Sequence, residues 1–168
     1  MKTGVKQMVL FLDYDGVVNC VMWEFDPTSS KYVSRYGCPK DGKVNNYQAV
    51  QWISELCQKY NIDIVVTSTW RLFDNYQRCL IDGGLRQGIK ILGRVSLDNN
   101  LSRAAQIQQY LEEHPEIGDQ FIIVDDDNVD MSEFGYDKLL HFIQCSTNAG
   151  FGYEEFERAS SAILKLTA

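Results

Sequence analysis

Short runs of consecutive apolar residues alternate along the chain with segments in which apolar residues recur every three or four positions. A short apolar run bounded by polar residues is typical of a strand that is buried on both faces of a sheet. The runs at 8–12, 62–66 and 121–124 fit this description best, and weaker runs stand at 89–95 and 139–143. The pattern therefore predicts five strands, two of them less strongly.

The segments between these runs have the period of amphipathic helices. Apolar positions are spaced in this way over 47–57, where Asn45 and Asn46 can cap the first turn, and again over 104–111 and 156–163. The alternation predicts an α/β fold with a Rossmann-like parallel sheet, helices on both faces and right-handed crossovers. No internal repeat or low-complexity tract is present, so we expect a single domain over 1–168.

Polar residues follow each of the three strongest strands at once. The sequence D-Y-D-G occupies 13–16, T-S-T-W-R occupies 67–71, and D-D-D occupies 125–127. In parallel α/β sheets, ligands bind beyond the carboxyl ends of the strands. These three clusters should therefore converge at one edge of the sheet.

Asp13 and Asp15 are candidates for the catalytic chemistry. Carboxylates two residues apart on extended backbone point to the same side. One can attack a phosphoryl group and form an aspartyl-phosphate, while the other protonates the leaving oxygen and later deprotonates the attacking water. The neighbouring negative charge raises the pKa of the second carboxyl, and Gly16 permits a sharp turn.

The same edge of the sheet is a candidate metal site. Crowding Asp13, Asp15, Asp125 and Asp126 together would cost several kcal/mol, given ~4 kcal/mol for each charge pair at about 4 Å and an effective dielectric of about 20. A divalent cation removes this cost. Oxygen ligands, in a chain with only two histidines, favour Mg²⁺ over zinc.

Other residues near the same edge of the sheet are candidates for binding the substrate phosphate. Thr67 and Ser68 offer hydroxyls and backbone N–H groups at the end of the second strand. A cation such as Arg103 or Arg71 would offset the charge of the transferring group.

Each of these features also has a purely structural interpretation. A D-x-D-G sequence is often a turn or part of a calcium loop, and the acidic triplet at 125–127 is also typical of a solvated loop. Thr67 can cap backbone groups, and Arg71 is expected in a surface ion pair. Trp52 and Trp70 are expected in the core. The joint position of the clusters after separate buried strands favours the catalytic interpretation.

Composition narrows the classes of function. The net charge of −7 disfavours binding of extended duplex nucleic acid, although a short phosphorylated end is compatible with it. Five cysteines without a C-x-x-C pair predict neither a disulfide framework nor a zinc ribbon, and they favour a reducing compartment. The apolar runs are too short for a signal peptide or a membrane span, so we expect a cytoplasmic protein with no membrane partner.

Phe11 to Asn19, F-L-D-Y-D-G-V-V-N, resembles the first motif of the haloacid dehalogenase (HAD) superfamily of aspartate-nucleophile phosphatases. V-V-T-S at 65–68 is similar to the second motif, and the aspartates at 125–126 are similar to the fourth. The third motif is a Lys or Arg, for which Arg103 is favoured, with Arg94 and Arg71 as alternatives. The resemblance implies a HAD-like core with a small flap or cap, and Mg²⁺ as cofactor.

Four further segments resemble the HAD domain of Swiss Army Knife RNA-repair proteins: T-S-T-W-R at 67–71, Y-L-E-E-H-P at 110–115, V-D-D-D at 124–127 and N-A-G-F at 148–151. In that lineage Asp13 is implied as the nucleophile, Asp15 as the acid/base, and the backbone carbonyl of Asp15 as a metal ligand. Thr67 would bind the phosphoryl group. Which residue of 125–127 touches the metal is left open, and Asp130 is expected to assist from outside the ligand set.

An insert at about 20–45 separates the first strand from the first helix, where superfamily members place a flap or small cap. Aromatic side chains interleaved with bases can stack on a nucleobase and hold a phosphate. The alternative is that the aromatics pack against the core. The residues concerned are Trp23, Phe25, Lys31, Tyr32, Arg35, Tyr36, Lys40 and Lys43.

The leading hypothesis is a Mg²⁺-dependent phosphomonoesterase that acts on nucleotides or phosphorylated nucleic-acid ends. A small-metabolite or sugar phosphatase with the same chemistry is one alternative. A non-catalytic HAD-like binding or regulatory module is another. The presence of both Asp13 and Asp15 argues against the module, because a member without activity would most easily lose one of them. The oligomeric state is left open.

Overall fold

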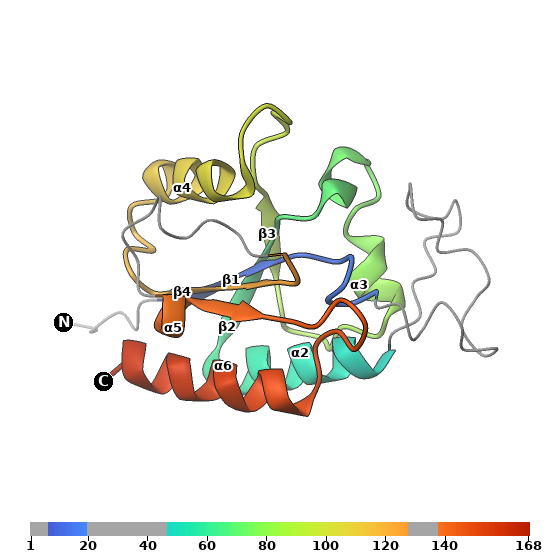
Figure 1. The fold of residues 1–168 in the computed structure, drawn as a ribbon, viewed down its shortest axis with the longest axis vertical. Helices are drawn as coiled ribbons and strands as arrows, with labels where there is room; N and C mark the ends of the chain where they lie inside the picture. The colour runs from blue at the N-terminus through green and yellow to red at the C-terminus, as the bar shows by residue number, and fades with distance from the viewer. Residues whose placement is uncertain (1–6, 20–46, 128–137) are drawn as a thin grey trace.

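Parallel strands form the centre of the molecule. The computed structural model describes residues 7–19, 47–127 and 138–168. Within them, five strands form one parallel sheet in the order β3-β2-β1-β4-β5 (Figure 1). The strands are β1 (Met8–Leu12), β2 (Ile62–Val66), β3 (Ile91–Arg94), β4 (Phe121–Asp125) and β5 (Phe142–Gln144). The predicted α/β, Rossmann-like parallel sheet is confirmed, whereas the insert at 20–45 and Asp130 lie outside the described residues.

The order in which the chain adds strands to the sheet reverses at the central strand, β1. From β1 the chain moves outward through β2 to β3, then returns to place β4 on the other side of β1. Leu12 pairs with Val66 of β2 and with Val124 of β4. The residues that follow these three strands therefore start from the same level, at the kind of switch point where α/β sheets bind ligands.

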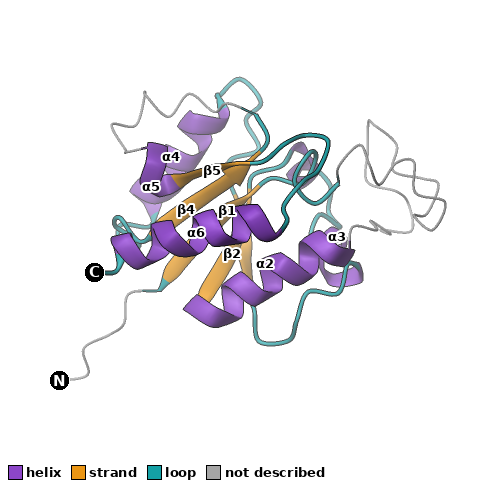
Figure 2. Ribbon diagram, turned by 60° about the horizontal axis from the view of Figure 1, so that its bottom comes forward, coloured by secondary structure: helices purple, strands orange, loops and turns teal. Residues whose placement is uncertain are grey.

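Helices cover both faces of the sheet, as predicted. On one face α2 (Tyr47–Tyr60) and α6 (Tyr153–Leu166) lie side by side, and on the other lies α4 (Arg103–Glu113) (Figures 1 and 2). Two short helices, η1 (Thr69–Leu72) and α3 (Arg78–Asp82), follow β2, and α5 (Lys138–His141) precedes β5. None of the described helices has the length and apolar character that crossing a membrane requires.

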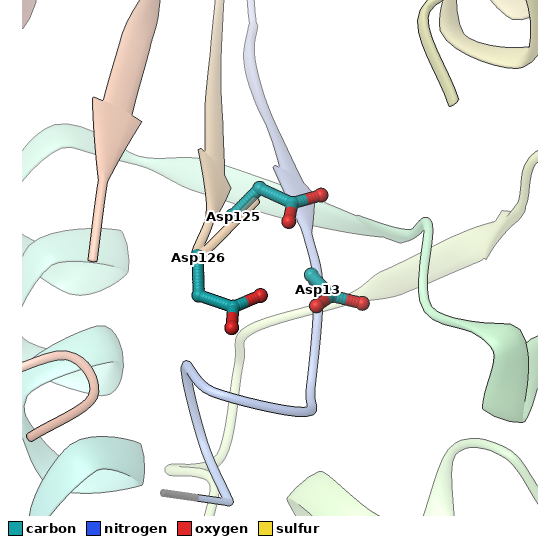
Figure 3. Close-up of side chains that lie close together, drawn as sticks. All are labelled: Asp13, Asp125 and Asp126. Atoms are coloured by element: carbon teal, nitrogen blue, oxygen red, sulfur yellow. The ribbon is translucent and has the colours of Figure 1, made fainter. Parts of the chain in front are cut away.

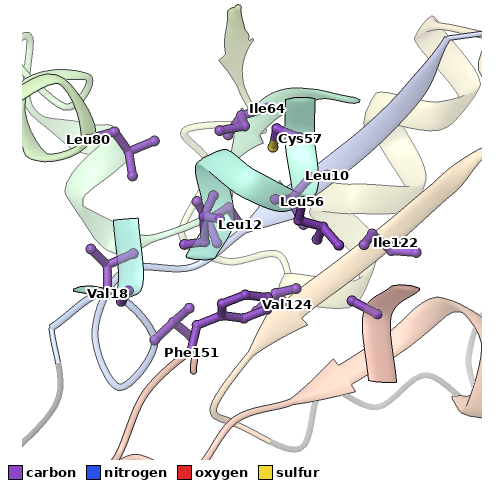
Figure 4. Packing of buried hydrophobic residues seen from close by; sticks show 14 of the residues in the cluster. Leu10, Leu12, Val18, Leu56, Cys57, Ile64, Leu80, Ile122, Val124 and Phe151 are labelled. Carbon is purple, nitrogen blue, oxygen red and sulfur yellow. The ribbon is translucent and has the colours of Figure 1, made fainter. Parts of the chain in front are cut away.

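Alternate side chains of each strand build two separate cores. Leu10 and Leu12 of β1 face α2 and α6 (Figure 4), whereas Val9 and Phe11 face α4. This division explains why the central strands are continuous apolar runs: both of their faces are buried. Burying each such side chain contributes roughly 1.5–3 kcal/mol.

The two tryptophans expected in the core differ in their burial. Trp70 is 3% exposed, which confirms the expectation. Trp52 is partly buried, and its ring lies 5.3 Å from that of Phe156, so that it joins α2 to α6.

The weaker strand predictions are only partly correct. The run at 139–143 was expected as a strand, but α5 continues to His141 and β5 begins at Phe142. The run at 89–95 contains β3, which is shorter. An apolar run of this length has no period that distinguishes a helical turn from a strand. The same limit explains why η1 and α3, of 4 and 5 residues, were not predicted.

Candidate active site

The carboxyl ends of β1, β2 and β4 carry Asp13, Thr67 and Asp125. The sheet hydrogen bonds continue to this level: Asp13 N–H donates to the Val124 carbonyl at 3.0 Å, and Thr67 N–H donates to the Leu12 carbonyl at 2.9 Å. All three side chains are buried. The sheet itself therefore brings together residues that are far apart in the sequence.

Arg103 enters this cluster from the first turn of α4. The helix begins there because the Ser102 hydroxyl accepts a hydrogen bond from the Ala105 N–H at 3.1 Å. The Arg103 Nη1 lies 3.0 Å from Asp13 Oδ1, 3.1 Å from Thr67 Oγ1 and 3.0 Å from Asp125 Oδ2. One guanidinium nitrogen thus contacts the ends of three strands.

Arg94, an alternative for the third motif, has different contacts. Its Nη1 donates to the Arg71 carbonyl at 2.6 Å, and its guanidinium lies 4.8 Å from the centre of the Tyr76 ring. Of the three arginines considered from the sequence, Arg103 is the one that the structure pairs with Asp13 and Asp125.

Three carboxylates form a group that suits a divalent cation. Asp13, Asp125 and Asp126 each offer an oxygen, and these oxygens all lie within 4.8 Å of one another (Figure 3). Oxygen donors from one or two carboxylates, completed by water and substrate phosphate, are the environment that Mg²⁺ prefers. Arg103 pairs with Asp13 and Asp125, which leaves this group with more negative than positive charge. These residues fit the Mg²⁺ that HAD proteins typically use.

Gly16 and Thr147 both lie close to the Asp126 side chain. An added Cβ on Gly16 would overlap the Asp126 carboxylate, and the φ of +74° at Gly16 also favours glycine. The Thr147 hydroxyl donates to Asp126 Oδ2 at 2.8 Å. Asp126 therefore occupies a restricted space beside the turn that follows β1.

Burial and crowding shift the acidity of the site. Burial raises the pKa of Asp125 to about 7, and the Asp13 charge adds to this effect while Arg103 opposes it. Burial also raises the pKa of Asp13, again against the effect of Arg103. Burial disfavours the Arg103 cation, but Asp13 and Asp125 outweigh it and raise the pKa of that guanidinium. Asp13 and Asp125 are therefore harder to ionise in the folded protein than in water, and a bound cation would favour their charged forms.

Asp15 lies outside the group of three carboxylates. Its Oδ2 accepts a hydrogen bond from the Trp70 indole N–H at 3.0 Å, and its Oδ1 lies 3.4 Å from the Asn19 amide nitrogen. Burial raises the pKa of Asp15, and these two hydrogen bonds oppose the rise. The expectation that Asp13 and Asp15 face one side depends on extended backbone beyond the end of β1 at Leu12, and it stays a prediction. The backbone carbonyl of Asp15 as a metal ligand stays a prediction.

Ser68 and the acidic triplet at 125–127 are the remaining predicted site residues, and the structure gives them different contacts. The Ser68 hydroxyl accepts from the Trp70 backbone N–H at 3.3 Å and caps η1, so its expected contact with phosphate stays a prediction. In the acidic triplet, Asp125 and Asp126 join the group, whereas Asp127 is exposed and its N–H donates to Asp125 Oδ1 at 3.0 Å.

Sequence reasoning was wrong about Arg71 and missed two other residues. Arg71 is 2% exposed and bonds to backbone carbonyls, so it is not in a surface ion pair. The contact of Trp70 with Asp15 and that of Thr147 with Asp126 were not foreseen. Trp70 and Thr147 each stand within or beside a segment of the family resemblance, at 67–71 and 148–151, which was the one available signal.

The fold and these strand-end residues define a HAD-like α/β domain. The family model described as the HAD domain in Swiss Army Knife RNA repair proteins matches residues 9–156. This match spans most of the chain, so the protein belongs to that family, within a superfamily of hydrolases and phosphatases. The resemblance found in the sequence is thereby confirmed. Comparisons with curated proteins and with solved structures found no match.

Proposed function

We propose that this protein is a Mg²⁺-dependent phosphomonoesterase that acts through an aspartyl-phosphate on Asp13. The observation that carries the proposal is the position of Arg103, whose Nη1 contacts Asp13, Thr67 and Asp125 at once, beside a group of three carboxylates. A cation and a hydroxyl next to a buried carboxylate suit the transfer of an anionic phosphoryl group to that carboxylate.

In the first step, a carboxylate oxygen of Asp13 attacks phosphorus and the bond to the leaving oxygen breaks. Asp15 supplies the proton that the leaving alcohol needs. Arg103 and the Thr67 hydroxyl hold phosphoryl oxygens and offset their charge. The raised pKa of Asp15 favours the protonated form that this step requires.

In the second step, Asp15 takes a proton from water while the water oxygen attacks phosphorus. The bond between phosphorus and Asp13 breaks, which releases phosphate and restores the carboxylate. Asp13, Asp125 and Asp126 would hold Mg²⁺, which, when bound, neutralises charge on the carboxylates and on the substrate phosphate.

Nucleotides and phosphorylated nucleic-acid ends are the proposed substrates. The family description names RNA repair proteins. The sequence of the insert at 20–45 interleaves aromatic and basic residues, which suits contact with a base and its phosphate. The net charge of −7 is compatible with a short phosphorylated end and disfavours extended duplex.

The decisive experiment measures phosphate release from nucleoside monophosphates, from 3′- and 5′-phosphorylated oligonucleotides and from sugar phosphates, with Mg²⁺ and with a chelator. We expect turnover only with the metal and the highest kcat/KM on nucleotides or nucleic-acid ends. A preference for sugar phosphates would support the small-metabolite alternative. No turnover of any substrate would support a binding module and contradict the proposal.

Asp13→Asn tests the covalent mechanism. The amide cannot act as the nucleophile, so we expect turnover to fall below detection while the protein keeps its fold. Asp82→Asn is the matched control, because Asp82 lies at the end of α3 in an ion pair with Arg78 and has no part in the site. Activity of the Asp13 variant within about tenfold of wild type would rule out an aspartyl-phosphate.

A further inference from the structure

Arg71 is a fully buried arginine that has no carboxylate partner among the described residues. Its side chain is 2% exposed, whereas arginines are rarely so buried unless they are paired. Its guanidinium instead donates to uncharged oxygens. They are the carbonyls of Ser96 at 2.8 Å, Ser68 at 3.2 Å and Thr67 at 3.3 Å, and the side-chain oxygen of Asn99 at 3.3 Å.

These acceptors belong to two segments that both contribute to the candidate site. Thr67 and Ser68 directly follow β2, while Ser96 and Asn99 belong to the connection from β3 to α4, which leads to Arg103. Gln106 of α4 also binds this connection: its side-chain amide donates to the carbonyls of residues 98 and 101 at 2.9 and 3.2 Å. Arg71 thus links the residues after β2 to the connection that leads to Arg103.

The contacts of Arg71 also orient the peptide groups after Thr67. Because a trans peptide is planar, its N–H points away from the side to which its carbonyl points. With the Thr67 and Ser68 carbonyls turned to Arg71, the N–H groups of Ser68 and Thr69 point away from it. These donors belong to the two residues that follow Thr67 in the chain, and oriented N–H groups of this kind bind anions.

The charge of Arg71 suits an anionic ligand as well. Burial lowers the pKa of its guanidinium, and so does the nearby Arg103, whereas Asp13 raises it. An arginine remains charged under such shifts. Arg71 therefore adds positive charge near Asp13, and no ion pair of the described residues joins it to a carboxylate of the site.

We propose that Arg71 is a positioning residue of the phosphate site: it aims the N–H groups of Ser68 and Thr69 at the substrate phosphoryl group and aligns the end of β2 with Arg103. The inference rests on the proposed phosphatase function. It assigns to Arg71 a role that acts through Thr67, Ser68 and Arg103, and no direct contact with substrate.

Arg71→Lys tests this role, because lysine keeps the charge but cannot reach four acceptors with the planar fork of arginine. We expect kcat/KM for p-nitrophenyl phosphate to fall about 10- to 100-fold. The inhibition constant of inorganic phosphate should rise about tenfold in the same variant. Arg86→Lys is the matched control: Arg86 hydrogen-bonds Gln51, Glu55 and Gln58 of α2, and its variant should match wild type.

Two further variants separate positioning from simple stability. Asn99→Ala removes one exposed acceptor of Arg71, so it should fold and should lower kcat/KM several-fold. In Arg71→Ala, guanidinium at non-denaturing concentration should restore part of the activity, and it should have no such effect on Arg86→Ala. A merely structural role would lower the melting temperature and the active fraction but leave the kcat of the folded protein unchanged.

The outcomes distinguish this inference from the proposed function. If wild type hydrolyses phosphomonoesters and both Arg71→Lys and Asn99→Ala have its kcat and KM, the positioning role is wrong and the phosphatase stands. If wild type hydrolyses none of the substrates, the proposed function fails. Phosphate binding, followed by ³¹P NMR, then decides the inference: weaker binding by the Arg71 and Asn99 variants supports it, and unchanged or absent binding overturns it.

Discussion

The contact between Gly16 and Asp126 shows how much of the site depends on one missing side chain. A Cβ at position 16 would overlap the Asp126 carboxylate, and the backbone there has a φ of +74°. Gly88 has a similar φ of +92°, but an added Cβ would meet nothing within 4 Å. The two glycines therefore separate the cost of backbone strain from the cost of displacing Asp126.

We predict that Gly16→Ala weakens Mg²⁺ binding about tenfold or more, because the displaced carboxylate can no longer join Asp13 and Asp125. Gly88→Ala should lose only the strain energy, about 1–2 kcal/mol of the free energy of unfolding, and bind Mg²⁺ as wild type does. Calorimetric titration with Mg²⁺ and urea unfolding measure the two effects. Equal Mg²⁺ affinity in both variants would show that the Gly16 contact does not position Asp126.

The connection between β5 and α6 also contacts the site. Cys145 N–H donates to the Asp125 carbonyl at 2.9 Å, and Phe151 N–H donates to the Val17 carbonyl at 2.8 Å. Thr147 lies between these anchors and donates to Asp126. The connection thus joins the end of β4 to the turn after β1.

Thr147→Val removes the hydroxyl and keeps the shape of the side chain. We expect Mg²⁺ affinity to fall about tenfold, as for other hydrogen bonds that orient a metal ligand. Thr167→Val is the matched control, since the Thr167 hydroxyl bonds to the Ile163 carbonyl at 2.9 Å at the end of α6. If both variants bind Mg²⁺ equally well, Thr147 does not orient Asp126.

Elements differ in how well the sequence predicted them. Central strands such as β1 and β4 are continuous apolar runs because helices cover both of their faces, so they could be recognised. At the border of α5 and β5 the pattern was ambiguous, because Phe142 and Ile143 continue an apolar run that starts in a helix. Local periodicity does not mark such a border.

Over the molecule as a whole, the buried acids of the site couple folding to pH. Burial raises the pKa of Asp125 from 3.8 to about 7, so between these values the folded state holds a proton that the unfolded chain has released. Folding takes up this proton, and the free energy of unfolding therefore falls as the pH rises through that window. Above it, the charged carboxylate is buried beside Asp13 at a cost in stability.

We predict that Asp125→Asn, which cannot titrate, removes part of this pH dependence. In a chelator, raising the pH from about 5 to about 8 should destabilise wild type relative to the variant by about 1 kcal/mol or more. Urea unfolding across this range measures the difference. Mg²⁺ should restore stability to wild type at about pH 8, because the cation replaces the proton. Parallel pH profiles for the two proteins would contradict the shift.

Local pattern was enough to indicate the α/β class, the three buried strands and the polar residues that follow them, because a strand covered on both faces must be apolar and its end is where solvent and ligand begin. The partners of those polar residues depend on contacts across the fold. Arg103 meets Asp13 over 90 positions and Trp70 meets Asp15 over 55. The contacts of the buried Arg71 likewise depend on the connection from β3 to α4, which supplies Ser96 and Asn99. Such contacts follow from how packed elements meet in space, and no local period of the sequence encodes them.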